Sequence, residues 1–250
     1  MVQWYKTNQR LFREEKAALA SKHPSLTLEM LGAGTPINKY VYLQREEVVV
    51  RGMYYLQVPD TTRKYDYSIA LRLPDDYPKH PPVTYCNDQK LPIDIDRHIL
   101  KNGQACLGAT AEVQRKWSSA PNLVSFLDVL VAPFLTWQVF FDAHGYPPPW
   151  GQRSHGKQGI LEFYAEILGL GAGANIEGFI NLLARKNTPG GHEMCPCNSG
   201  QRLRNCHRDA VYAARQEVDW NDAKSDLLLL ARQDSETSVK IQTRGLTMQF

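Results

Sequence analysis

Large apolar residues alternate with polar ones along parts of the N-terminal half, as they do in strands that bury one face of a sheet. The clearest alternation runs from Tyr65 to Leu73, where every second side chain is large and apolar. Val48 to Val58 and Lys39 to Leu43 are also rich in β-branched and aromatic residues, and Val83 to Tyr85 is a short further candidate. The sequence therefore predicts four antiparallel strands.

Apolar residues recur every three or four positions in five other segments, which is the period of a helix with one buried face. The first segment ends before Pro24, because the residue before a proline avoids the helical conformation. The others follow the strands, after an irregular stretch from Asn87 to Ser119. The five segments are Thr7 to Lys22, Leu123 to Leu135, Ile160 to Leu170, Ile176 to Leu183 and Val211 to Arg232. This order predicts an α+β fold, with a four-stranded antiparallel sheet flanked by helices and a smaller helical region behind it.

Two breaks divide the chain. Three consecutive prolines between Tyr146 and Trp150 favour a stiff, extended spacer, and Thr188 to Gly191 is a second hinge. We therefore expect four parts. They are a domain over residues 1–145, a proline-rich linker with short helices over 146–191, a cysteine-rich segment over 192–209, and a C-terminal helix and tail over 210–250.

The composition is that of an ordinary globular protein. Of the 250 residues, 43% are hydrophobic and 22% are charged, which excludes a disordered, collagen-like or coiled-coil chain. The net charge of +3 is too small to indicate a nucleic-acid partner. The longest apolar stretch, Phe126 to Phe141, is broken by polar residues and is shorter than a membrane span, and no leader-like segment opens the chain. We therefore expect a soluble, cytoplasmic protein without a membrane partner.

Three of the five cysteines lie within twelve residues, and a histidine follows the last of them. Three thiolates and one imidazole form a tetrahedral ligand set that is typical of structural zinc, because four protein ligands leave no open position for catalysis. The sequence therefore predicts a structural Zn²⁺ site. Its ligands are Cys195, Cys197, Cys206 and His207.

Cys106 is a candidate nucleophile in the irregular stretch before the long apolar helix. It follows an Asn-Gly turn and is flanked by Gly103 and Gly108, so the loop can give the thiol access to a second molecule. Sulfur is intrinsically nucleophilic, and thioester exchange therefore needs access more than a strong base. The alternative is a small buried apolar residue, which is the usual role of an unpaired cysteine. Cys86, in or beside a strand, fits that alternative.

The order of these features from about Leu11 to Phe141 resembles the ubiquitin-conjugating enzyme family. That family has a helix, four antiparallel strands, a Tyr-Pro-x-x-Pro-Pro turn (here Tyr77 to Pro82), a Gly-x-x-Cys-Leu loop (here Gly103 to Leu107), and then a tryptophan (here Trp117). The resemblance implies a ubiquitin-conjugating-like catalytic domain over residues 1–145. It also implies that Cys106 accepts the C-terminus of a ubiquitin-like protein as a thioester and passes it to an amine.

One triplet departs from the family pattern. The family has a His-Pro-Asn triplet whose asparagine, eight residues before the cysteine, is credited with stabilising the oxyanion during transfer. This chain has Asp96-Arg97-His98 there. His98 could supply the oxyanion hydrogen bond, since an imidazole can donate one. Alternatively, His98 only holds the loop in place, or another group donates the hydrogen bond to the oxyanion. Asp96 would either orient His98 or act on the pKa of an incoming lysine.

The cysteine-rich segment resembles the SEC-C zinc motif, first known from the C-terminal tail of the SecA motor protein. The fourth ligand there is cysteine or histidine, so His207 fits. The combination implies a bacterial protein, since similar conjugating-like proteins lie in antiviral defence operons beside activating enzymes or cGAS-like nucleotidyltransferases. The implied partner is a protein with a conjugatable C-terminus, either a ubiquitin-like protein or such a nucleotidyltransferase.

The chain lacks a phosphate-binding glycine loop, so a separate activating enzyme or an already activated C-terminus must supply the acyl group. Two alternatives remain open. Some relatives of conjugating enzymes keep the fold and bind ubiquitin-like proteins without chemistry, and the altered triplet favours such a silent binding module. In the other, the protein is an adaptor whose function lies in the SEC-C segment.

Overall fold

The computed structural model describes residues 3–58, 63–149, 153–154, 156–171 and 173–231, so the expected tail from Ser235 to Phe250 lies outside the described residues. The chain forms two compact units. The first contains the described residues up to Leu107 together with 116–149, and the second contains 108–115 together with the described residues from Arg153 onward. Residues 108–115, which we expected in the N-terminal domain, therefore pack with the C-terminal unit.

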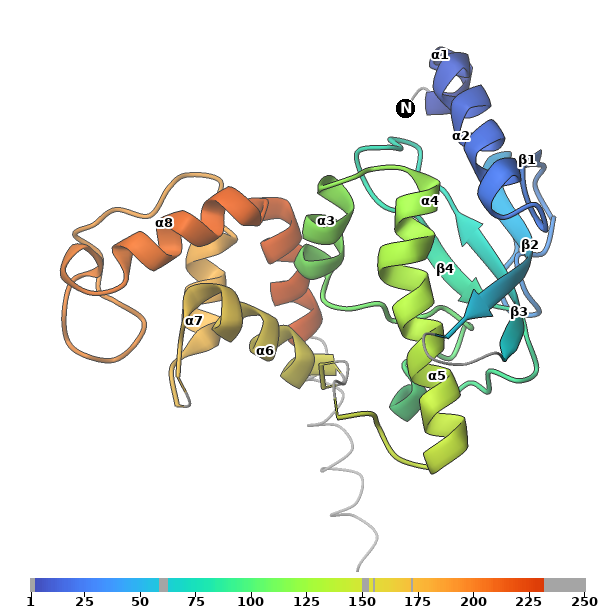
Figure 1. Ribbon diagram of the computed structural model, residues 1–250. Helices are drawn as coiled ribbons and strands as arrows, with labels where there is room; N and C mark the ends of the chain where they lie inside the picture. Colours follow the sequence, from blue (N-terminus) through green and yellow to red (C-terminus); the bar gives the residue numbers. More distant parts are fainter. Residues whose placement is uncertain (1–2, 59–62, 150–152, 155, 172, 232–250) are drawn as a thin grey trace, which may run out of the picture. The chain divides into compact units, whose positions relative to one another are not determined.

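The first unit is built on a four-stranded antiparallel sheet, in which the strands follow one another in the order β1-β2-β3-β4 (Figure 1). The expected alternation in the third strand is confirmed, since Tyr67, Ile69 and Leu71 are all buried. The strands are β1 (Leu26–Leu31), β2 (Glu47–Gln57), β3 (Lys64–Arg72) and β4 (Val83–Cys86). The predicted α+β fold with a four-stranded antiparallel sheet is thus confirmed.

One predicted strand is wrong. Lys39 to Leu43 lies in the loop between β1 and β2, outside the sheet. The side chain of Asn38 accepts hydrogen bonds from the backbone amides two and three residues further on, which curls the segment into a turn. Ile37 and Leu43 are buried in a cluster with Val49 of β2, so the apolar residues of this segment anchor a loop to the sheet.

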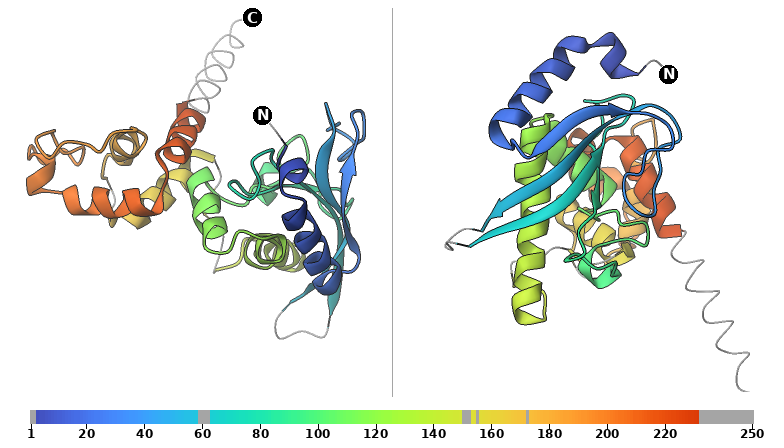
Figure 2. Two further views of the ribbon diagram at one scale, coloured as in Figure 1. Left: turned by 90° about the horizontal axis from the view of Figure 1, so that it is seen from above. Right: turned by 90° about the vertical axis from the view of Figure 1, so that its right-hand side faces the viewer.

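Helices cover one face of the sheet (Figure 2). α1 (Trp4–Thr7) and α2 (Gln9–Lys22) precede it in the chain, and a continuous helix over Leu123–His144 follows it. The long helix consists of α4 (Leu123–Phe126), a π-helical turn η2 (Leu127–Val131) and α5 (Ala132–His144). α2 contacts α4, and both α2 and the long helix lie on the same side of the sheet.

The long helix has 22 residues and is the one helix among the described residues that is long and apolar enough to cross a membrane by length and composition. It exceeds the apolar run of Phe126 to Phe141 counted from the sequence, because the helix extends three residues beyond that run at each end. Half of its most apolar window is buried inside the protein. Burial in the core accounts for its apolar composition.

The turn at Tyr77–Pro78 is anchored by hydrogen bonds to two side chains. Buried Glu15 of α2 accepts hydrogen bonds from the Tyr77 hydroxyl and from the backbone amide of Leu123, which begins α4. The indole of Trp117 donates to the carbonyl of Pro78 at 2.8 Å. Burial raises the pKa of the Glu15 carboxyl. Trp117 therefore holds the turn that precedes β4.

The second unit is helical. Its helices α6 (Gly156–Leu168), α7 (Ile176–Leu183) and α8 (Arg208–Glu217) contact one another in pairs, and the short η3 (Leu203–Asn205) contacts α8. The predicted helix from Val211 to Arg232 is interrupted at Val218, and a further helix occupies residues 220–231. Arg215 of α8 donates hydrogen bonds to four carbonyls at the end of α7 and just beyond it, groups that a helix end leaves without partners. This arginine ties α8 to α7.

The cysteine-rich segment shares one hydrophobic core with these helices. Buried Cys195 and Leu203 belong to the same cluster as Phe163 of α6 and Phe179 of α7. Ala111, in the first turn of α3 (Thr110–Ser118), belongs to that cluster as well. The parts that we expected as separate linker, metal segment and C-terminal helix therefore form one packing unit, which also includes the first half of α3.

A buried carboxylate holds the start of α3. Asp226, on the helix over residues 220–231, is fully buried. It accepts hydrogen bonds from the amides of Thr110 and Ala111 at 2.8 and 3.0 Å, and from the hydroxyl of Tyr164 at 3.1 Å. An acidic side chain in this position caps the free amides of a helix N-terminus and also complements the helix dipole. The C-terminal helix therefore fixes the chain that begins four residues after Cys106.

We expect Asp226→Ala to destabilise the second unit by about 2–4 kcal/mol, because three buried donors lose their common acceptor. Chemical denaturation monitored by circular dichroism measures this change. Asp209→Ala is the matched control, since Asp209 is an exposed residue of α8 whose pair with Arg208 lies at the surface. Equal stability of the two variants would contradict the capping role of Asp226.

Candidate functional site

The loop that carries Cys106 is fixed to the edge of the sheet by backbone hydrogen bonds. The amide of Ala105 donates to the carbonyl of Thr84 in β4, and residues 99 and 105 form an antiparallel bridge. The amide of Cys106 donates to the carbonyl of His98 at 2.8 Å. Gly103 has a positive φ of 79°, and an added Cβ would lie 2.6 Å from the Asn38 side chain, so the turn requires glycine. The loop is irregular in shape but well connected.

The thiols of Cys106 and Cys86 lie in different surroundings. Cys106 is partly exposed. Cys86 at the end of β4 is only 8% exposed, and burial raises the pKa of its thiol to about 12. A buried neutral thiol is a poor nucleophile, whereas a partly exposed thiol on a fixed loop can meet a second molecule. Cys106 therefore has the exposure that a nucleophile needs, and Cys86 does not.

The structure brings His98 next to Cys106 through the backbone. His98 follows the short helix η1 (Ile95–Arg97) in the left-handed conformation, with φ 55°. It is 6% exposed, and its ring meets that of Trp137 edge-on with 5.4 Å between the centroids. Asp96, by contrast, is exposed, and its backbone amide donates a hydrogen bond to Asp94 Oδ1 at 2.9 Å.

The sequence pattern did not indicate the role of Arg97, which lies between these two residues. Its Nε donates to Gln138 Oε1 at 3.1 Å, its terminal NH₂ group pairs with Asp142, and its guanidinium lies 5.2 Å from the centroid of the Phe141 ring. Gln138 in turn donates from Nε2 to the backbone carbonyl of Arg97 at 2.8 Å. The sequence feature that could have indicated these contacts is Gln138 itself, a glutamine inside the apolar stripe of the long helix, because a buried amide needs hydrogen-bond partners.

The four predicted metal ligands converge. Their donor atoms all lie within 4.8 Å of one another. His207 Nδ1 lies 3.3 Å from Cys195 Sγ and 3.1 Å from Cys206 Sγ, and Cys197 Sγ lies 3.4 Å from Cys206 Sγ. A tetrahedral zinc ion would hold such ligands about 3.5–3.8 Å apart, so the donor set fits with a small expansion. These four residues could therefore hold a metal ion.

Local geometry brings the ligands round one point. Asn198 and Gly200 both have positive φ, 62° and 73°, which turns the chain sharply between the second and third cysteines. The amide of Cys195 donates to the carbonyl of Gln201 and closes this turn. The Ser199 Oγ lies in hydrogen-bond contact with Cys197 Sγ at 3.2 Å, and this contact lowers the pKa of the Cys197 thiol to about 6. A low thiol pKa favours the thiolate form that binds a metal.

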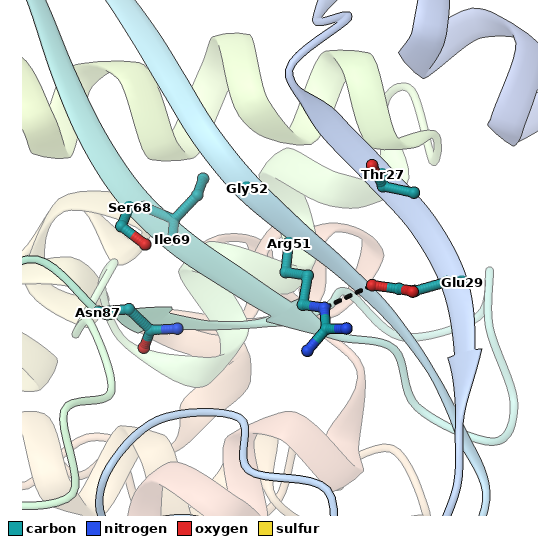
Figure 3. A pocket seen from close by; sticks show the side chains of 7 residues that line it. All are labelled: Thr27, Glu29, Arg51, Gly52, Ser68, Ile69 and Asn87. Atoms are coloured by element: carbon teal, nitrogen blue, oxygen red, sulfur yellow. Dashed lines mark hydrogen bonds and ion pairs between the residues drawn. The ribbon is translucent and has the colours of Figure 1, made fainter.

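A separate pocket of about 400 Å³ lies on the sheet (Figure 3). Arg51 of β2 and Glu29 of β1 form an ion pair across it, and Thr27, Ser68 and Asn87 add polar side chains. None of the predicted site residues lines this pocket. The pocket is therefore distinct from the Cys106 loop.

Comparison with known proteins gives few matches. No family model matches the sequence, and no curated protein matches it. The solved structures that are similar to part of the chain include two structures of a UEV domain. The UEV domain of yeast Vps23 in complex with a Vps27 PSDP peptide has 18% identity and a TM-score of 0.35, covering 51% of this chain and 81% of that one. A complex of the Vps23 UEV with ubiquitin has 17% identity and a TM-score of 0.34, covering 56% and 85%.

Proposed function

We propose that this chain is a ubiquitin-conjugating-like transferase in which Cys106 carries the C-terminus of a partner protein as a thioester. The observation that carries this proposal is the partly exposed thiol on a loop that backbone hydrogen bonds fix to β4. The order of motifs from Leu11 to Phe141 supplies the family analogy. The partner is a protein with a conjugatable C-terminus, such as a ubiquitin-like protein or a cGAS-like nucleotidyltransferase.

The reaction has two acyl transfers. The Cys106 thiolate attacks the activated carbonyl of the partner's C-terminus, an S–C bond forms, and the activating group leaves with the bonding electron pair. An amine then attacks the thioester, a C–N bond forms, the amine loses a proton to solvent, and the thiolate leaves. Each step passes through an oxyanion that a hydrogen-bond donor stabilises. A separate activating enzyme, or a C-terminus that is already activated, supplies the first acyl group.

Capture from cells that contain the natural partner tests the proposal. Wild-type protein is purified under mildly acidic conditions and analysed on denaturing gels with and without a thiol reductant. A reductant-sensitive band at the summed mass of the protein and its partner supports a thioester. Recovery of a partner without any covalent species points to a binding module instead.

The second candidate function is a catalytically silent binding module on the same fold. The observation that favours it is the burial of His98, which is 6% exposed where the family has its oxyanion asparagine. A ring packed against Trp137 is held in place and is less free to meet a transient oxyanion. The two functions differ in the fate of Cys106 and in the effect of changing His98.

If His98 donates to the oxyanion, His98→Ala should slow transfer to amine by about a hundred- to a thousandfold, the usual cost of losing one such donor. Thioester formation should continue. Single-turnover release of the partner from Cys106 to free lysine measures the transfer step. His80→Ala is the control, since His80 is a partly exposed histidine paired with Asp76. Equal release rates for His98→Ala and wild type would remove His98 from the mechanism, and Asp96 would then have no histidine to orient.

The metal site and cellular setting complete the proposal. Cys195, Cys197, Cys206 and His207 would hold a structural Zn²⁺, because four protein ligands fill a tetrahedral site and leave no place for substrate. The likeness of this segment to the SEC-C motif supports a bacterial, cytoplasmic protein. A role in antiviral defence rests on the resemblance alone. If the first unit binds no partner, an adaptor function of the SEC-C segment takes its place.

A further inference from the structure

Side chains of α5, the last part of the long helix, hold the segment that precedes the candidate nucleophile. Gln138 is fully buried and contacts residue 97 twice, since it accepts from the guanidinium and donates to the backbone carbonyl. Asp142, one helical turn further on, pairs with the same guanidinium. Arg97 itself is only 9% exposed. Both the side chain and the backbone of residue 97 are therefore fixed, and we call Arg97, Gln138 and Asp142 the α5 clamp.

The α5 clamp is connected to Cys106 by one further residue. His98 follows Arg97 directly, and its carbonyl accepts the hydrogen bond from the Cys106 amide at 2.8 Å. His98 has a left-handed backbone, which a residue other than glycine adopts only when its surroundings hold it there. Gln138 thus holds one peptide group of residue 97, and the next carbonyl holds the cysteine. The position of the thiol depends on that short path.

From these contacts we infer that Gln138 and Arg97 are positioning residues for Cys106. They hold the His98 carbonyl in place and so fix the thiol relative to an incoming acyl group. A buried charged group that only filled space would be poorly suited to the site, since burying a charge is costly unless it is paired and hydrogen-bonded. Here the guanidinium pairs with Asp142 and donates to Gln138, and Gln138 in turn holds the backbone carbonyl of residue 97. The inference deepens the proposed function and rests on it for the transfer step.

Gln138→Met tests the inference because methionine has a similar volume and removes both hydrogen bonds to residue 97. Leu28→Ala is the matched control, a buried residue of β1 at the opposite edge of the sheet from β4. Thermal unfolding shows whether the two variants are comparably destabilised. Asp142→Ala removes only the half-exposed arm of the α5 clamp, and it keeps the test informative if Gln138→Met does not fold.

The first readout needs no partner. Full-length protein is treated with iodoacetamide, and alkylation of the peptide that contains Cys106 is followed by mass spectrometry. Losing a hydrogen bond to the loop should raise the population of open conformers about fivefold, so Cys106 should react about fivefold faster in Gln138→Met than in Leu28→Ala. Asp142→Ala should show a smaller rise. Equal alkylation rates in the clamp variants and the control would overturn the inference.

The second readout uses the transfer reaction. A misplaced thiol should lower kcat for transfer to amine about tenfold to a hundredfold and leave KM for the amine unchanged. Leu28→Ala should change neither constant at temperatures where it is folded. The two readouts separate the claims: faster alkylation without any thioester supports the positioning role and defeats the proposed transferase. A thioester together with unchanged alkylation and unchanged kcat supports the proposed transferase and defeats the positioning role.

Discussion

Replacing Cys106 with serine is expected to abolish transfer to amine and to convert the reductant-sensitive adduct into a reductant-resistant ester. Serine occupies the same place on the loop, so its hydroxyl can still be acylated slowly by the partner's activated C-terminus. An alkoxide is a much poorer leaving group than a thiolate, and the ester therefore persists. Loss of an enzyme's nucleophile typically lowers its turnover by about 10⁴-fold or more. Gels with and without reductant, run on captured Cys106→Ser protein, measure both effects.

Cys86→Ala is the control for this experiment. The Cys86 thiol is buried and its pKa is raised to about 12, so its removal should leave the adduct intact. An adduct that survives in Cys106→Ser and remains sensitive to reductant would place the acyl group on another cysteine. That result would reject Cys106 as the carrier.

The control is informative because Cys86 is a buried cysteine of the same unit. Its replacement by alanine removes a thiol and keeps the backbone hydrogen bond from the Cys86 amide to the carbonyl of Gly103 in the loop that carries Cys106.

If the four-ligand cluster holds a metal ion, its removal is expected to loosen the whole second unit, including residues 109–115, which follow Cys106 in the chain. Cys195 and Leu203 share a hydrophobic core with Ala109 and Ala111, so losing the ligand geometry disturbs that core as well as the short cysteine loop. Structural zinc contributes about 10 kcal/mol or more of folding free energy in small metal-binding peptides. Cys197→Ser, or treatment with a strong chelator, should therefore release about one zinc ion per chain and sharply increase amide exchange over 109–115.

Hydrogen exchange measured by mass spectrometry can separate local from wider effects. Peptides from β2 and β3 should keep their protection, since these strands belong to the first unit. Arg202→Ala is the matched control, because Arg202 is an exposed residue of the same loop and is not a ligand. Release of the metal with unchanged exchange over 109–115 would show that the cysteine segment folds on its own.

Local periodicity was enough to predict much of the fold. The alternation in β3 and the helical spacing of α7 depend on neighbouring residues alone, and the structure contains both elements close to their expected bounds. The cysteine spacing also predicted which four side chains converge, because a sharp turn brings residues this close in sequence together. Each of these features is decided within about a dozen residues.

The errors have a common physical cause. Lys39 to Leu43 has strand-like composition, but its flanking apolar residues bury a loop against the sheet. β1 was missed because only Leu26 and Leu28 of its six residues are buried, which gives a weak alternation. α3 was missed because its first half packs in the second unit and its N-terminus is capped by a distant residue. In each case the deciding contact is with a segment far away in the chain.

The sequence by itself determined the antiparallel α+β sheet, the long apolar helix and the four candidate metal ligands, since these follow from short-range patterns of side chains. Only the tertiary structure decided that Cys106 is partly exposed while Cys86 is buried. It also decided that Gln138 reaches Arg97 across 41 positions and that Asp226 reaches Thr110 across 116. Burial and long-range hydrogen bonds depend on which segments contact one another in the folded chain, and local sequence patterns do not determine those contacts.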